Sequence, residues 1–214
     1  LTERDAVVVS LAAPVLRILC VSLVMALVIA ALVREIGDRT HLMALAAPIA
    51  RGGWIAAKLA GFTTISAMTA AASGAVLWLL APPGAGPAAA AWTVSLAMEL
   101  AICAAIAMTV ALALRQVPVA LLAAAGVYVA ARLIGVIQRI NAHSPAGEGT
   151  TAGDAMALPL GVLGALLPRL DLFARTDWLT GAPVDGFWAM PLQAALYLVL
   201  MATVAAFDYR KRDA

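Results

Sequence analysis

Hydrophobic residues form long uninterrupted runs along this chain, and charged or turn-forming residues gather between the runs. A helix needs about 20 apolar residues to cross the hydrocarbon core of a bilayer, which is roughly 30 Å thick. Five runs reach that length, so the pattern predicts an all-α, polytopic bundle of transmembrane helices that forms a single domain over residues 1–214. The predicted spans cover residues 6–33, 53–80, 89–114, 117–138 and 187–207.

The segments between the runs are short or broken by turn residues. A Pro/Gly-rich turn at 82–87 separates the second and third spans, and Pro118 suits the first turn of the fourth. A sixth apolar stretch, Ala155–Leu167, has 13 residues and contains a proline. That length predicts a short re-entrant or interfacial helix inside an outer segment at 139–186, not another span.

Composition excludes a soluble domain. The chain is 64% hydrophobic and 12% charged, with a mean hydropathy of +0.98, whereas soluble domains are about 45–50% apolar and 25% charged. The net charge of +2 gives no basis for binding nucleic acid. Cys20 and Cys103 both lie inside apolar runs, which favours small buried side chains over a disulfide.

Lysine and arginine are distributed unevenly around the spans, and they set the predicted orientation because cytoplasmic loops carry the excess of these residues. With five spans, most of them fall on one side, which predicts a cytoplasmic C-terminus and an outward N-terminus. We expect a further span before Leu1, which would give six spans with both ends inside. The residues on the predicted cytoplasmic side are Arg34, Arg39, Arg51, Lys58, Arg115, Arg210, Lys211 and Arg212.

The connection at 34–52 has two interpretations on composition alone, an ordinary charged loop and a short amphipathic helix. Glu35 and Asp38 stand where the first turn of a short helix would favour carboxylates, an apolar face follows, and Pro48 would end the helix. The pattern predicts an amphipathic helix at the membrane surface.

The order of residues in this connection resembles the cytoplasmic coupling segment of type-2 ATP-binding-cassette permeases. That segment reads R-E-x-x-x-[RG]-T, then a leucine, then P-[IV]-x-R, followed by a helix that opens near G-K. Here Ala57 replaces the glycine that often precedes the lysine. A second stretch, Leu166-Leu167-Pro168-Arg169-Leu170-Asp171-Leu172-Phe173, is similar to an outer element in a bacterial, exporter-like branch of that family. The matching residues in the first segment are Arg34, Glu35, Arg39, Thr40, Leu45 or one of its neighbours, Pro48, Ile49, Arg51 and Lys58.

The resemblance implies a permease subunit in the bacterial inner membrane, working as a homodimer or heterodimer among membrane lipids. ATP and Mg would be bound by a separate ATPase subunit, since this chain has no phosphate-binding loop motif. The substrate would be a lipid, a drug or another amphiphile, and export is the expected direction. The residues expected to contact the ATPase are Arg34, Glu35, Asp38, Arg39, Thr40, Pro48 and Arg51.

Three charged residues lie deep inside predicted spans. At 1.5 Å per residue, Glu99, Arg17 and Arg132 lie about 22, 24 and 21 Å from the inner ends of their spans. A charge near the bilayer centre costs about 2.5–3.5 kcal/mol or more, so we expect Glu99 to pair with Arg17 or Arg132. The pair would either fix helix register, which is the favoured interpretation, or line a substrate route.

Other residues support less specific interpretations. The five tryptophans, near predicted span ends, predict an aromatic belt at the headgroups. His41 and His143 have no neighbours at metal-ligand spacing. Alternative functions are a membrane-embedded enzyme, for which the usual hydrolase and protease motifs are missing, and a structural subunit of a membrane complex.

Overall fold

The computed structural model describes residues 3–38, 51–81, 85–143, 164, 167–180 and 187–212. Most of these residues are helical and none of them forms a strand, and five helices are long and apolar enough to cross a membrane. A short helix and a 3-10 turn precede the last of them. The elements are α1 (Glu3–Gly37), α3 (Arg51–Leu80), α4 (Gly86–Leu114), α5 (Val117–His143), α7 (Leu170–Phe173), η1 (Asp177–Thr180) and α8 (Ala189–Arg212).

The five predicted spans are therefore confirmed as helices, and most extend beyond their apolar runs. α1 continues through Arg34 to Gly37, and α8 continues into the basic tail as far as Arg212. Helical hydrogen bonding does not stop where apolar residues stop, so a spanning helix can project past the hydrocarbon core. The predicted coupling helix falls largely at 39–50, outside the described residues, as does most of the stretch Ala155–Leu167.

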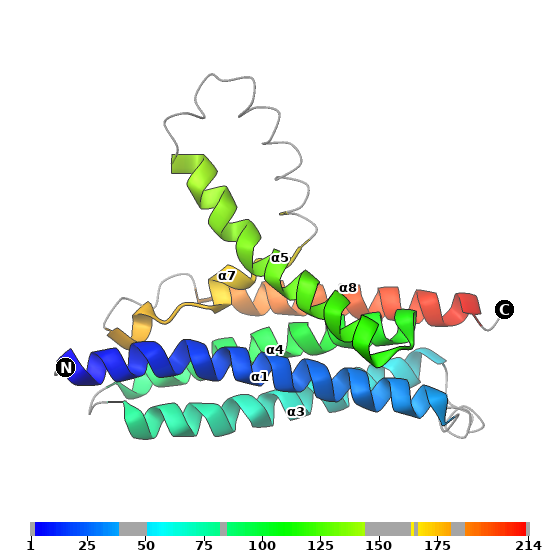
Figure 1. The fold of residues 1–214 in the computed structure, drawn as a ribbon, viewed down its shortest axis with the longest axis horizontal. Coiled ribbons are helices and arrows are strands. Elements are labelled where there is room, and N and C mark those ends of the chain that lie inside the picture. The colour runs from blue at the N-terminus through cyan, green and yellow to red at the C-terminus, as the bar shows by residue number, and fades with distance from the viewer. Residues whose placement is uncertain are drawn as a thin grey trace, which may run out of the picture.

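Four of the long helices lie side by side, and α5 leans away from them (Figure 1). α1, α3, α4 and α8 run roughly parallel or antiparallel, and the two chain ends lie at opposite ends of the bundle. The end of α1, the start of α3, the α4–α5 turn and the end of α8 share one end. We call this the α1–α3 joint end, and the other the N-terminal end.

α4 is the central helix of the bundle. It packs against α1, α3, α5 and α8, and two thirds of its most apolar stretch is buried, against about a fifth for α8. Its apolar residues surround the helix axis, which is typical of a helix buried on all sides. Many of them are alanines, which let neighbouring helices approach closely.

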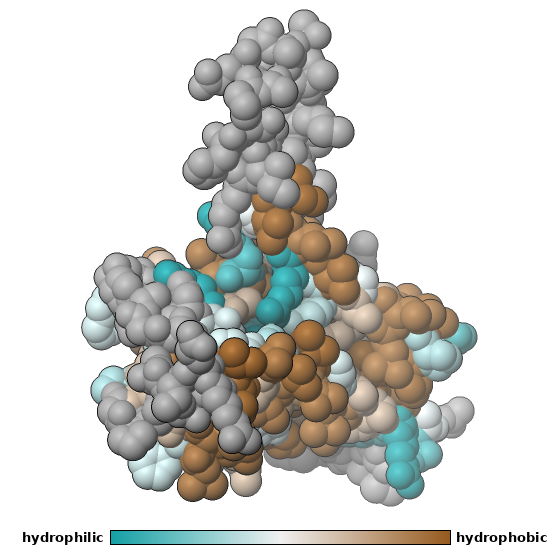
Figure 2. Space-filling view, turned by 60° about the vertical axis from the view of Figure 1, so that its left-hand side comes forward, coloured by the Kyte–Doolittle hydropathy of each residue, from teal (hydrophilic) through white to brown (hydrophobic). Residues whose placement is uncertain are grey.

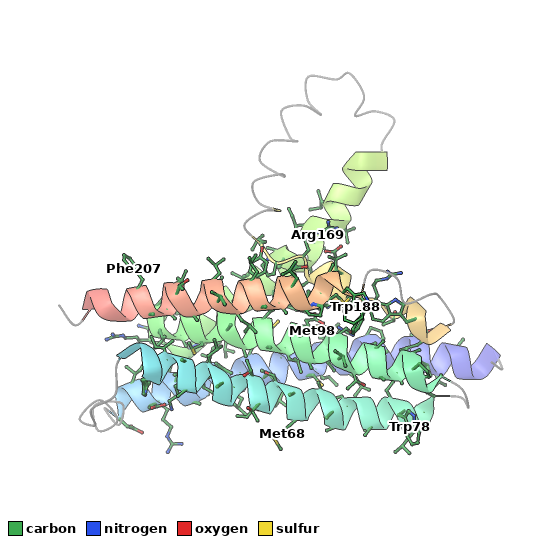
Figure 3. The ribbon with its side chains drawn as sticks, turned by 180° about the vertical axis from the view of Figure 1, so that it is seen from behind. Met68, Trp78, Met98, Arg169, Trp188 and Phe207 are labelled. Carbon is green, nitrogen blue, oxygen red and sulfur yellow. The ribbon has the colours of Figure 1, made fainter. Side chains whose placement is uncertain are left out.

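The outer surface of the bundle is hydrophobic, as expected for contact with lipid. Large apolar side chains such as Leu11, Leu122 and Leu192 are well exposed, and hydrophobic residues cover much of the face in Figure 2. Trp78 and Trp188 are also exposed and lie toward the N-terminal end, with Phe207 toward the other (Figure 3). These exposed rings fit an aromatic belt.

The belt prediction is wrong for the remaining tryptophans. Trp54, Trp92 and Trp178 are buried, at 7%, 0% and 2% exposed. Trp54 and Trp92 lie near the starts of α3 and α4, and Trp178 lies in η1, but all three side chains are buried against neighbouring elements. Proximity to a span end therefore did not determine which way a ring faces.

Two glycines allow very close approach between elements. A Cβ added at Gly74 of α3 would overlap the Thr93 side chain of α4, and a Cβ at Gly135 of α5 would overlap the Asp171 carboxylate of α7. These are positions where only glycine fits the present packing. The second contact fixes the short helix α7 against α5.

Candidate functional site

Glu99 is the centre of a charged network inside the bundle. It lies on α4 and is fully buried. Its Oε2 accepts a hydrogen bond from Nη1 of Arg17 at 2.5 Å, and its Oε1 accepts one from Nη1 of Arg132 at 2.9 Å. The Tyr128 hydroxyl also donates to Oε1, at 3.2 Å. Both carboxylate oxygens are thus occupied by donors from two other helices.

Arg17, on α1, is fully buried and connects three elements. Besides Glu99, its Nη1 donates to the backbone carbonyl of Phe173 at 2.7 Å, and its Nη2 donates to Oγ of Ser95 at 3.0 Å. The guanidinium also lies over the Trp92 ring, 5.0 Å from the centroid. Arg17 therefore holds α1 to α4 and to the C-terminal end of α7.

Burying two opposite charges is tolerated only if their partners and hydrogen bonds offset the loss of water. In this network each charge has several short contacts, and among the Arg17 nitrogens only Nε is buried without a hydrogen-bond partner in the described part of the chain, so the arrangement meets most of that condition. Removing one member would leave an uncompensated buried charge, which typically costs about 3–5 kcal/mol. The network is for this reason a strong constraint on how α1, α4 and α5 pack.

Arg132, on α5, occupies the edge of the network. Its Nη1 donates to the Tyr128 hydroxyl at 2.6 Å as well as to Glu99, and its guanidinium lies 5.7 Å from the Tyr128 ring centroid. The Arg132 side chain is 27% exposed, whereas Arg17 and Glu99 are 0% exposed. Figure 2 shows hydrophilic side chains gathered at the foot of the part that leans away, bordered by hydrophobic ones.

The short helix α7 closes the same region from one side. Asp171 is buried against Gly135 of α5, and Nη2 of Arg169 lies 3.5 Å from its Oδ2. Figure 3 places Arg169 beside the leaning helix. Because Arg17 bonds the Phe173 carbonyl, α7 is attached both to α5 and to the buried network.

The structure thus brings together all three residues that sequence depth singled out: Glu99, Arg17 and Arg132. The sequence predicted that Glu99 pairs with one arginine or the other, whereas Glu99 pairs with both.

The sequence analysis missed Ser95 and Tyr128, although helical spacing offered a signal. Ser95 stands four residues before Glu99, and Tyr128 four before Arg132, so each shares a helix face with its charged neighbour. Trp92 and the Phe173 carbonyl were also missed. No side-chain pattern could have revealed the carbonyl, because every residue has one.

The predicted ATPase-contacting residues form a separate group at the α1–α3 joint end. Nζ of Lys58 lies 2.6 Å from Oε2 of Glu35, which joins α3 to α1. Arg34 and Asp38 form a loose pair, 3.7 Å apart and one helical turn from each other, with side chains 85% and 62% exposed. Glu35 is therefore engaged within the chain, while Arg34 and Asp38 face outward.

The other predicted contact residues are described only in part. Arg39, Thr40 and Pro48 lie outside the described residues, and Arg51 is described only as the first residue of α3. A pocket of about 390 Å³ opens between α1 and α3 beside the Glu35–Lys58 pair, with Trp54 in its lining. Glu35 lies 18 residues beyond Arg17 on α1, about 27 Å away along the axis, so the two groups occupy opposite halves of the bundle.

Within the described part of the chain, no group of three metal-ligating side chains occurs. Cys20 and Cys103 are both free and buried. Comparison with protein-family models gives no match, and comparison with curated proteins gives none either.

Proposed function

We propose that this chain is the permease subunit of an ATP-driven transporter, with ATP bound and hydrolysed on a separate ATPase subunit. The proposal includes a dimer of permease subunits in a bacterial inner membrane and export of a lipid, a drug or another amphiphile. It rests mainly on one observation: the segment that resembles a coupling segment joins two long antiparallel helices, α1 ending at Gly37 and α3 beginning at Arg51.

That position suits the transmission of force. A segment joined directly to the ends of two helices moves them as rigid bodies when a partner pushes on it. The Glu35–Lys58 ion pair and the contacts between α1 and α3 keep the two ends together. Arg34 and Asp38 remain exposed at the end of α1, where a partner surface can meet them with charge-assisted hydrogen bonds.

The distribution of charge supports the proposed orientation. Arg34, Lys58 and Arg115 belong to the α1–α3 joint end, as does the basic C-terminal end of α8. An excess of lysine and arginine at one end of a bundle indicates the cytoplasmic side. An ATPase in the cytoplasm would therefore meet the end that carries Arg34 and Asp38.

The buried network gives this movement a route to the opposite half. Arg17 lies on the same helix as Arg34 and is bonded to α4 and α7. A tilt of α1 driven from the joint end would strain or rearrange those bonds, since a packed polar network has discrete arrangements. In this proposal, motion driven by the ATPase changes the buried network from one arrangement of hydrogen bonds to another.

The test is co-purification with a candidate ATPase, followed by measurement of ATP hydrolysis by the complex. Reversing an exposed charge with Asp38→Arg should weaken ATPase binding. A matched control exchanges the internal pair in the double variant Glu35→Lys/Lys58→Glu, which keeps an ion pair at that site and should bind the ATPase more nearly as wild type does. Normal binding and hydrolysis with Asp38→Arg, in a chain that folds as wild type does, would contradict the assigned contact surface.

A further inference from the structure

The buried network contains more positive than negative charge. Within the described residues, Arg17 and Arg132 both bond to a single carboxylate, that of Glu99. Adding the neighbouring pair of Arg169 and Asp171 leaves the excess of one positive charge unchanged. An excess charge among membrane-spanning helices is unfavourable unless an anion or water meets it, and such residues commonly mark ligand pathways.

Arg132 has spare hydrogen-bonding capacity at a position that a ligand can reach. A guanidinium has five N–H donors in a planar fork. In Arg132, Nη1 serves both Glu99 and Tyr128, while Nε and Nη2 donate to no group among the described residues. Nε of Arg17 also has no hydrogen-bond partner among the described residues, but it is buried. The Arg17 guanidinium is enclosed by Glu99, Ser95, the Phe173 carbonyl and the Trp92 ring.

Accessibility points to the same residue. The Arg132 side chain is 27% exposed, and the other two charged members of the network are 0% exposed. An incoming ligand can therefore reach the network through Arg132. Planar guanidinium groups bind carboxylates and phosphates with two parallel hydrogen bonds.

The exposed neighbours of Arg132 along α5 are apolar. On the same helix, Val129, Leu133 and Val136 are 51%, 50% and 45% exposed. These residues lie within about one helical turn of Arg132 along α5. A ligand that contacts both Arg132 and its surroundings would gain from an apolar chain as well as from an anionic group.

We propose that Arg132 is the binding site for the anionic headgroup of an amphiphile, whose apolar chain lies along α5. The headgroup receives hydrogen bonds from the edge of the guanidinium that Glu99 and Tyr128 leave free. Glu99 and Tyr128 position that guanidinium and do not contact the ligand. The binding site itself does not depend on the proposed function. If that function is correct, on which this step rests, the transported substrate is an anionic amphiphile.

The experiment measures binding of short-chain phosphatidylglycerol to the purified full chain in a neutral maltoside detergent, with phosphatidylcholine of the same chain length as the comparison. Wild type should bind phosphatidylglycerol more tightly, because only that lipid has a net negative headgroup. Arg132→Gln should weaken its binding by about tenfold, the effect of losing a hydrogen-bonded charge contact.

Two further variants make the result specific. Arg34→Gln removes the same charge from an exposed site at the opposite end and should leave phosphatidylglycerol binding unchanged. Arg132→Lys keeps the positive charge and a donor for Glu99 but lacks the planar fork, so it should fold even if Arg132→Gln does not, and should still bind the lipid more weakly.

Several outcomes would overturn the proposal. They are equal binding of the two lipids by wild type, wild-type affinity in both Arg132 variants, and an equal loss of binding with Arg34→Gln. Competition by inorganic phosphate with the same affinity would exclude an amphiphile and indicate a site for free anions. If the chain binds the lipid but co-purifies with no ATPase, the proposed transport function is wrong and the lipid site stands. If the chain forms the ATPase complex but does not bind the lipid, only the lipid site is wrong.

Discussion

The contact between Gly135 and Asp171 offers a direct test of how α7 is seated. Replacing Gly135 with alanine places a methyl group where Cγ, Oδ1 and Oδ2 of Asp171 now lie. The buried helix α7 would have to move, and overpacking of this kind costs typically about 1–3 kcal/mol. Alanine also favours the helix over glycine by roughly 0.5–1 kcal/mol, which offsets part of that cost.

The same helix provides the matched control. A Cβ at Gly126 would meet nothing within 4 Å, so Gly126→Ala should gain the helical preference without the overlap. The helical preference of alanine over glycine is the same in both variants and cancels when they are compared. Gly135→Ala should therefore be less stable than Gly126→Ala by about 1–3 kcal/mol. That difference corresponds to about 5-fold to 150-fold in the unfolding equilibrium.

The assay is unfolding in mixed micelles by added dodecyl sulfate, followed by tryptophan fluorescence. Trp178 lies in η1, which follows α7 closely, and is buried, so its emission should respond if α7 moves. In a double-mutant cycle, Asp171→Ala removes all three overlapping atoms and should relieve most of the cost of Gly135→Ala. Equal stability of the two glycine variants, or costs that simply add in the cycle, would refute the seating of α7 on α5.

Three other predictions use the same unfolding measurement. Glu99→Gln should destabilise the bundle by about 3–5 kcal/mol, because it leaves a buried arginine without its counter-charge; a loss below about 1 kcal/mol would contradict the network. Gly74→Ala, which forces a methyl group onto Thr93, should be less stable than Gly61→Ala on the same helix, where a Cβ meets nothing within 4 Å, by about 1–3 kcal/mol. Arg115→Gly should stabilise the chain by about 0.5–1 kcal/mol, because Arg115 ends α4 with a φ of 53°, a conformation that costs least for glycine; a loss of stability would indicate a role for its side chain.

Much of the fold could be predicted because the bilayer permits few solutions. A run of about 20 apolar residues must form a helix there, since its backbone groups find no water. The five spans follow from that argument, as does the depth of Glu99, Arg17 and Arg132, because the rise of 1.5 Å per residue converts position in the sequence into position along an axis. Residues at equal depth on different helices were therefore candidates for contact before any packing was known.

Depth along an axis does not determine which way a residue faces or which helices are neighbours. The sequence could not show that α4 lies in the centre, so it could not show that Glu99 would meet arginines from α1 and α5 together. The same limit explains Trp92: its position near the start of α4 suggested the headgroup region, whereas packing puts its ring under the Arg17 guanidinium. Neighbouring helices, and not the span itself, determine that orientation.

The contribution of α7 depended on the tertiary structure alone. A four-residue helix has no periodic pattern to detect, and its main link to the network is a backbone carbonyl, which every residue carries. Its fit against Gly135 depends on the crossing of α5, which arises from the packing of the whole bundle. The sequence by itself thus determined five apolar helices and the depth of their charges, because lipid leaves a helix few alternatives; the tertiary structure alone decided which of those charges meet, because that depends on helix rotation and crossing.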